Sequence, residues 1–145
     1  MAVHTILNRE DIKEILKLYS IGNLKEFRGI TEGIENTNYF LKTTKDNYIL
    51  TIYESRVKIK DLPFYFDLMN YIKSKGINCP QSISNNTDER LETIKKKKLA
   101  IFTFIKGKCL DIWDKNDCYS VGKELGKLHS VSNEFKMVKK NDFGL

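Results

Sequence analysis

Three strand-like runs in the first half of the chain lie too close together for helical crossovers to connect them. They are residues 24–28, 39–43 and 48–53, separated by the turn segment GITEGIENTN and by the short reversal TKDN. Parallel strands need a crossover of about a dozen residues or more, usually a helix. We therefore predict that these three strands pair antiparallel.

Apolar spacing and capping residues predict the helices. Asn8 precedes a helix that reaches Tyr19 and carries apolar residues at i, i+3, i+4 and i+7. A second helix is predicted for residues 61–75, because Pro63 suits a first turn and Gly76 a stop. Asp114 precedes a third helix that reaches Val131, whose inward face we expect to be Cys118, Val121, Leu125 and Leu128.

Two more strands, at about 90–94 and 99–105, complete the predicted sheet. The lysines 95–98 between them are expected to form a solvated hairpin end. This order predicts an α+β fold: a five-stranded antiparallel sheet with one helix inserted after the third strand.

Length and composition are those of one soluble domain. The chain has 145 residues, of which 41% are hydrophobic and 30% charged. No run approaches the roughly 18 apolar residues of a membrane span, and the N-terminus lacks the pattern of a signal peptide. The three cysteines have no metal-ligand spacing, so we expect reduced thiols in the cytoplasm, no structural zinc and no membrane partner.

The net charge of +6 does not by itself indicate a nucleic-acid partner. Of the 25 basic residues only four are arginine, the residue suited to bidentate contacts with phosphate or guanine. The lysine-rich mixture matches an A/T-rich coding bias. A basic module that binds nucleic acid or an acidic partner stays open as an alternative, but we expect no nucleic acid.

The stretch FRGITEGIENTNYFLKT, residues 27–43, is the most informative turn in the chain. Gly29 and Gly33 let the backbone approach a ligand closely, and Asn36 and Asn38 suit either side-chain contacts or turn conformations. On spacing alone, an ordinary hairpin loop is the favoured interpretation. The spacing is neither that of a P-loop nor that of a dinucleotide fingerprint. A loop that covers phosphates between two antiparallel strands is the nucleotide-binding arrangement that remains.

The chain resembles the N-terminal part of homoserine kinases of the aminoglycoside-phosphotransferase-like type. The matching segments occur in order over nearly all of the chain, and EGIENTNYFL and LTIYE are the most specific; the others are YSIGNLKEFRGIT, DLPFYFDLMNYIKSKGINCP, LAIFTFIKGK and VGKELGKLHSVS. The resemblance implies a protein-kinase-like N-terminal lobe in residues 1–107 and the first helix of a truncated C-terminal lobe in residues 108–145.

The same resemblance implies ATP as cofactor, with Mg²⁺, and a place in threonine biosynthesis. The γ-phosphate of ATP would pass to the hydroxyl of homoserine. Backbone near the end of the last strand would meet the adenine, and the glycine-rich loop would cover the phosphates. The implied nucleotide-binding residues are Gly29, Glu32, Gly33, Asn36, Asn38, Thr51, Thr103, Phe104 and Ile105.

One departure from the wider kinase pattern concerns the phosphate-contacting cation. Thr51 stands about where kinases carry the lysine that holds the α- and β-phosphates. Arg56 and Lys58 are the nearest candidates to replace it, although a solvated loop charge is the simpler interpretation of both. The side chains of Phe102 and Phe104 are interpreted as core packing.

The catalytic part of a kinase is not found in this sequence. No H-x-D-x-x-x-x-N segment follows either histidine, so we predict no catalytic or metal-binding residues in the chain and no homoserine kinase activity for it alone. Asp142-Phe143-Gly144 spells a kinase metal motif, but no catalytic loop precedes it, and we interpret Asp142 as a surface turn residue. An exposed lobe interface predicts self-association. Another small-molecule kinase or a pseudokinase lobe stays open as an alternative.

Overall fold

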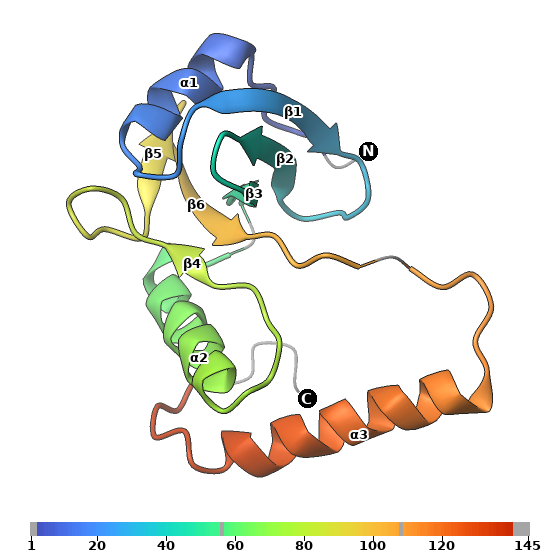
Figure 1. Cartoon of the computed structure of the whole chain (residues 1–145). Coiled ribbons are helices and arrows are strands. Elements are labelled where there is room, and N and C mark those ends of the chain that lie inside the picture. The colour runs from blue at the N-terminus through green and yellow to red at the C-terminus, as the bar shows by residue number, and fades with distance from the viewer. Residues whose placement is uncertain (1–2, 56, 108, 141–145) are drawn as a thin grey trace. The chain divides into compact units, whose positions relative to one another are not determined.

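The computed structural model describes residues 3–55, 57–107 and 109–140, which form two compact units (Figure 1). The first unit comprises Met1–Leu62 and Pro80–Phe104, and the second comprises Pro63–Cys79 and Ile105–Leu145. Asp142 lies outside the described residues. The predicted lobe boundary between residues 107 and 108 stays a prediction.

The first unit holds one helix and an antiparallel sheet whose path is β1-β2-β3-β6-β4, with β5 also paired to β6. The helix is α1 (Arg9–Lys17), and Figure 1 shows it beside β1. The strands are β1 (Leu24–Ile30), β2 (Thr37–Thr43), β3 (Asn47–Ile52), β4 (Ser82–Ile83), β5 (Glu92–Ile94) and β6 (Lys97–Thr103). The antiparallel pairing predicted for the first three strands is confirmed.

The described sheet has six strands, so the prediction of five was wrong by one. The strand that the sequence did not reveal is β4, which consists of two residues and therefore shows no alternation of apolar and polar positions. It pairs with the end of β6, while β5 pairs with the beginning of β6 on the same edge. The two short strands together cover the side of β6 that faces away from β3.

Helix α1 forms where the sequence predicts it and covers one face of the sheet. The Asn8 side chain accepts from the Asp11 N–H at 2.8 Å, and the Asp11 carboxylate accepts from the Asn8 N–H at 2.9 Å, which is a capping box. Ile12, Ile15 and Leu16 are buried in the main core of the unit. Their sheet partners in that core are Tyr39, Leu41, Tyr48, Leu50, Ile52, Leu99 and Ile101.

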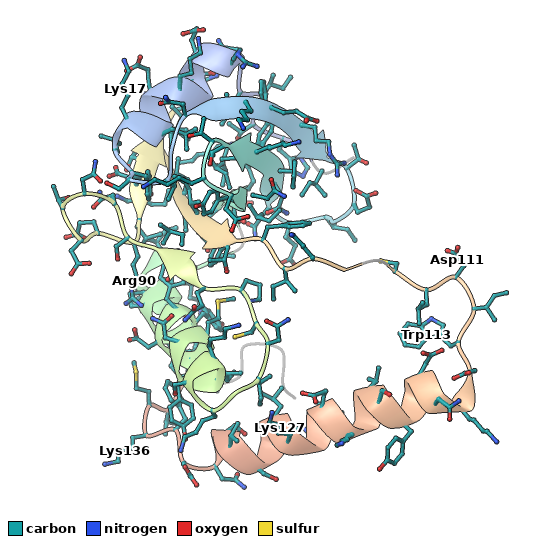
Figure 2. The ribbon with its side chains drawn as sticks, in the orientation of Figure 1. Lys17, Arg90, Asp111, Trp113, Lys127 and Lys136 are labelled. Carbon is teal, nitrogen blue, oxygen red and sulfur yellow. The ribbon has the colours of Figure 1, made fainter. Side chains whose placement is uncertain are left out.

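The second unit contains α3 (Lys115–Ser132) and all of α2 (Leu62–Ser74) except Leu62, whereas the short 3₁₀ helix η1 (Ile59–Asp61) before α2 belongs to the first unit. Phe135 packs its ring against those of Phe64 and Tyr71, with centroids 5.7 and 5.2 Å apart. Lys127, labelled in Figure 2, donates from α3 to the carbonyl of Gly76 at 2.9 Å. Gly76 has φ +77 and ends the preceding helix as predicted.

The inward face predicted for α3 is wrong. Cys118, Val121 and Leu125 are exposed, Leu128 is half-buried, and α3 has no buried residue among those described. The apolar stripe is present in the sequence, but no described segment of the chain covers it. No helix in the described residues is long and apolar enough to span a bilayer.

Candidate nucleotide-binding face

The sheet face opposite α1 carries Asn38 and Thr51, two of the residues that the sequence singled out. In an antiparallel sheet, paired residues share a face, and alternate residues along a strand share it as well. The register therefore places two rows side by side on this face. One row is Ile30, Asn38, Thr51 and Ala100, and the other is Arg28, Phe40, Ile49 and Phe102.

Asn38 and Thr51, both among the predicted site residues, are in direct contact. The Thr51 hydroxyl donates to Asn38 Oδ1 at 2.8 Å, and both side chains are half-buried. This bond uses the hydroxyl's only proton and fixes the orientation of the Asn38 amide, whose N–H₂ end then points away from Thr51. The pair can present amide donors and a hydroxyl lone pair to a ligand, but no positive charge.

The aromatic end of the face combines Phe40, Phe104 and Arg28. The rings of Phe40 and Phe104 meet edge to face, with centroids 5.2 Å apart, and Phe104 keeps 36% of its surface exposed. The Arg28 guanidinium lies over the Phe40 ring, 5.1 Å from its centroid. Phe102 is buried, as its core interpretation predicts, whereas Phe104 keeps an accessible ring.

Backbone groups at the end of β6 are already partly engaged. The Thr103 N–H donates to the Gln81 carbonyl at 3.0 Å, and the Phe104 N–H donates to the Asn47 carbonyl at 3.3 Å. The Thr103 hydroxyl accepts from the Gln81 N–H at 3.0 Å. Of the three residues predicted to meet adenine, only Ile105 therefore has a backbone N–H not engaged in these bonds.

The loop between β1 and β2, residues 31–36, is the predicted phosphate-covering segment. Gly33 has φ +115, a conformation that L side chains rarely adopt, so glycine is required there. Glu32 is exposed, and Asn36 Oδ1 accepts from the Glu54 N–H at 3.4 Å. Gly29 pairs with Tyr39 and belongs to the α1 face, where a Cβ would lie 3.0 Å from the Val3 side chain. Its role is close packing rather than contact from the open face.

A partly buried ion pair that the sequence did not single out lies at the base of this loop. Glu54 and Lys97 form a salt bridge, with 9% of the Glu54 side chain exposed and 38% of that of Lys97. The hydroxyls of Thr5 and Thr37 each donate to Glu54 Oε1 at 2.7 Å. Burial by itself raises the pKa of Glu54, but the hydrogen bonds from Lys97, Thr37 and Thr5 outweigh it and hold the pKa below its ordinary value.

The lysines 95–98 were expected to be solvated at the end of a hairpin, but two of them form long-range ion pairs. Lys97 joins the Glu54 pair, and Lys95 bonds to the Asp11 carboxylate at 3.0 Å and to the Ile6 carbonyl at 2.8 Å. The hairpin itself is confirmed, and its turn is formed by Lys95 and Lys96 with φ of +47 and +66. The partners of these lysines, Asp11 and Glu54, are distant in sequence, so the local residue pattern could not predict the two ion pairs.

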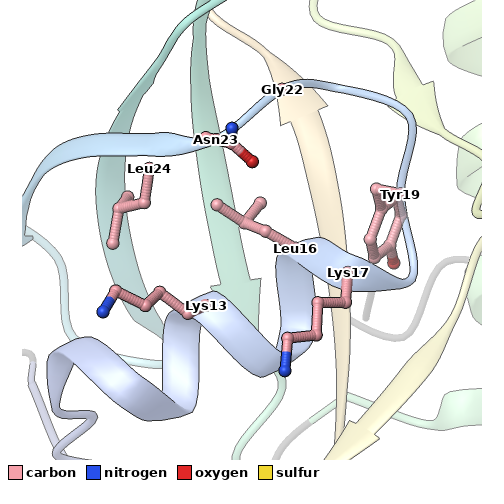
Figure 3. Close-up of a pocket in the computed structure, with 7 residues that line it drawn as sticks. All are labelled: Lys13, Leu16, Lys17, Tyr19, Gly22, Asn23 and Leu24. Carbon is pink, nitrogen blue, oxygen red and sulfur yellow. The ribbon is translucent and has the colours of Figure 1, made fainter.

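A separate pocket of about 450 Å³ lies between α1 and the beginning of β1 (Figure 3). Lys13 and Lys17 form its basic rim, and Leu16, Tyr19 and Leu24 form its apolar wall. Each lysine is paired with a glutamate one turn earlier in α1, Glu10 at 2.8 Å and Glu14 at 2.6 Å. The rim therefore carries little net charge, and we assign no ligand to it.

The remaining sequence candidates do not gather into a catalytic or metal site. Lys58 is exposed, and Arg56 lies outside the described residues. Within the part of the chain that is described, no three His, Cys, Asp or Glu side chains cluster as a metal site would require.

Curated relatives match the whole length of this chain. It is 40% identical over 145 residues to a homoserine kinase of Beijerinckia indica, covering 100% of this chain and 45% of that protein. A homoserine kinase of Bartonella henselae is 38% identical, with 100% of this chain and 46% of that protein covered. The chain thus spans about half the length of the curated relatives it matches. The resemblance to homoserine kinases predicted from the sequence is confirmed.

Solved structures of low sequence identity share the fold. A spectinomycin phosphotransferase in complex with ADP and spectinomycin has a TM-score of 0.67 at 14% identity, over 94% of this chain and 43% of that one. A microcompartment-associated aminopropanol kinase has a TM-score of 0.68 at 14% identity, over 95% and 44%. The predicted α+β, kinase-like fold is confirmed by both. The model of the phosphotransferase enzyme family matches residues 26–144, and the chain therefore belongs to that family.

Proposed function

We propose that this chain is the nucleotide-binding part of a homoserine kinase, the enzyme that transfers the γ-phosphate of ATP to the hydroxyl of homoserine. The observation that carries the proposal is the continuous match, 40% identical over all 145 residues, to a relative named homoserine kinase. The product would be O-phosphohomoserine, an intermediate of threonine biosynthesis. The proposed ligands are ATP and homoserine, in the cytoplasm, with neither nucleic acid nor membrane as a partner.

The proposed nucleotide site is the open sheet face together with the loop 31–36. Adenine would lie near the end of β6, where the Phe104 ring is accessible and the Ile105 N–H is the remaining backbone donor among the predicted residues. The phosphates would lie under the loop, near Glu32, Gly33 and Asn36. Asn38 and Thr51 would contact them with polar but uncharged groups.

Arg28 is a cation on this face that the sequence did not propose. It shares a row with Phe40, and its guanidinium already lies over that ring. An arginine held flat against an aromatic ring can stack on a base or contact a phosphate. Because Thr51 replaces the usual lysine, Arg28 is a candidate for the positive charge, alongside Arg56 and Lys58.

We propose that the chain by itself binds nucleotide without phosphorylating homoserine. Its 145 residues contain no H-x-D-x-x-x-x-N segment, and its described residues contain no metal cluster. Phosphoryl transfer depends on positioning and on charge stabilisation by metal and catalytic side chains. No step of the reaction is therefore assigned to residues of this chain.

Calorimetric titration of the purified chain with ATP, ADP and AMP, with and without Mg²⁺, tests the proposal. We expect ATP and ADP to bind and homoserine to cause no ADP release above background in a coupled assay. Homoserine-dependent release of ADP would contradict the proposed inactivity. Absence of any nucleotide binding, together with salt-sensitive binding to unrelated duplex DNA, would favour the basic interaction module instead.

A further inference from the structure

The partly buried pair Glu54–Lys97 connects three parts of the chain that are distant in sequence. Glu54 follows β3, Lys97 begins β6, and both bond to the N-terminal segment through Thr5. The Thr5 hydroxyl donates to Glu54 Oε1 at 2.7 Å and accepts from Lys97 Nζ at 2.8 Å. Thr37, the first residue of β2, also belongs to the network, because its hydroxyl donates to Glu54 Oε1.

Thr37 couples this network to the N-terminal segment through the backbone as well. Its hydroxyl accepts from the N–H groups of His4 and Thr5 at 2.9 and 3.0 Å while it donates to Glu54. Thr37 is fully buried, so each of these groups would be costly to leave without a partner. The arrangement fixes residues 4 and 5 along the beginning of β2.

The network then reaches the loop 31–36 by two separate contacts. His4 Nε2 lies 3.3 Å from the Ile34 carbonyl, an arrangement in which the ring N–H donates. The Glu54 N–H donates to Asn36 Oδ1 at 3.4 Å. A pocket of about 400 Å³ at the base of the loop is lined by His4, Ile34, Glu35, Glu54, Ser55 and Lys97.

We infer that the Glu54–Lys97 network positions the loop 31–36 from the α1 side of the sheet, and so sets the shape of the phosphate end of the nucleotide site. The inference about phosphate rests on the proposed function; the inference about the loop does not. None of the network residues lies on the open face, so they act through the loop and are positioning residues. Asn36, bonded to Glu54 and adjacent to Thr37, is the link between the two faces.

The test compares Glu54→Gln with Lys95→Gln, a control in the β5–β6 hairpin to which Lys97, the partner of Glu54, belongs. Lys95 also makes a long-range ion pair, but its ammonium donates to the Asp11 carboxylate and to the Ile6 carbonyl, neither of which belongs to the loop. The first measurement is hydrogen exchange of the unliganded chain. In E54Q we expect amides of residues 31–36 to exchange about tenfold faster, the equivalent of about 1.4 kcal/mol, while Leu50 and Ile101 stay protected. In K95Q the loop should exchange as in the wild type.

The second measurement separates positioning from general stability. Affinities for ATP and for adenosine are compared in each variant. If the network positions the loop, E54Q should weaken ATP about tenfold and leave adenosine unchanged, because only ATP has phosphates under the loop. Lys97→Arg, which keeps a donor and a charge, should restore much of the ATP affinity that Lys97→Met loses.

The outcomes distinguish the two proposals. Wild-type protein that binds no nucleotide overturns the proposed function, while the exchange result still decides whether the network holds the loop. Unchanged loop exchange in E54Q overturns the inference, and so does equal weakening of ATP and adenosine. If E54Q fails to fold, Thr5→Ala removes one hydroxyl from the network, keeps the Thr5 N–H bond to Thr37, and is judged by the same two measurements.

Discussion

Asn38 and Thr51 face each other across β2 and β3, and the Thr51 hydroxyl donates to Asn38 Oδ1 at 2.8 Å. This bond occupies the position where the sequence, read against kinases, lacks the expected lysine. The half-buried pair fixes an amide on the open face without bringing a charge there. The positive charge that a bound nucleotide would need is therefore not supplied by this pair.

Removing the Thr51 hydroxyl should weaken both the fold and nucleotide binding modestly. Thr51→Val keeps the shape of the side chain but leaves Asn38 Oδ1 without its donor, so we expect the free energy of unfolding to fall by about 1 kcal/mol. ATP affinity should fall several-fold, because the Asn38 amide is free to rotate. Urea unfolding and calorimetric titration measure the two effects. The exposed Thr93, in β5, provides Thr93→Val as a control that should change neither.

The Glu54 carboxyl should make the chain sensitive to acid. Its pKa is held below the ordinary value of 4.5, so below about pH 4.5 the unfolded chain takes up a proton more readily than the folded chain. The contribution of the ionised Glu54 carboxylate to the free energy of unfolding is full above that pH. It is lost as the pH falls through the lower pKa of the folded state. Urea unfolding at a series of pH values measures it. As the pH falls, the free energy of unfolding should decrease less steeply in Glu54→Gln than in the wild type.

A change at Thr37 gives the acid prediction an independent check. Thr37→Val removes one hydrogen bond to the carboxylate, so the pKa of Glu54 should rise toward its ordinary value and the acid-dependent loss should shrink. Thr37→Ser keeps the hydroxyl and should retain the wild-type pH dependence. Identical pH profiles for the valine and serine variants would show that this bond does not set the titration of Glu54.

Local signals explain which parts of the fold the sequence could predict. The capping box at Asn8 and Asp11 and the apolar face of α1 lie within a single helix, and the β2–β3 hairpin spans only a short reversal. By contrast, β4 has only two residues and therefore shows no alternation of apolar and polar positions. For α3 the pattern shows which residues are apolar, but it contains no information on whether another segment covers them.

The candidate site likewise has some features that the sequence could predict and others that depend on how distant strands align. Asn38, Thr51 and Gly33 were chosen individually from the sequence, yet the bond between Asn38 and Thr51 depends on the register of two strands. The Glu54–Lys97 pair joins residues 43 positions apart and depends on how β3 and β6 align. The alternation in β2 places Phe40 on the same face as Asn38, and this signal in the sequence could have identified it.

The turn between β5 and β6 offers a stabilising substitution. Lys95 and Lys96 both have positive φ, the pattern of a two-residue hairpin turn that favours Asn-Gly. Lys96→Gly removes the strain of a side chain at φ +66 and leaves the Lys95 bond to Asp11 in place, so we expect a gain of about 0.5–1 kcal/mol. Thermal unfolding measures it. Lys98→Gly, in the strand itself, should instead lose a similar amount.

The exposed apolar stripe of α3 should cause the purified chain to self-associate. Val121 and Leu125 are 53% and 49% exposed, one turn apart on the same helix, and Trp113, 58% exposed, precedes them. Leu125→Glu should lower the association constant about tenfold or more in sedimentation velocity, because a charge must then be desolvated in the contact. The same substitution should change the free energy of unfolding by less than about 0.5 kcal/mol, since the side chain is exposed. Lys123→Gln and Lys123→Glu, between the two apolar residues but on another side of the helix, are the controls for charge, because they change the net charge by −1 and −2 against −1 for Leu125→Glu. A wild-type chain that sediments as a monomer at all concentrations, or equal effects of the two glutamates, would exclude the stripe as the contact.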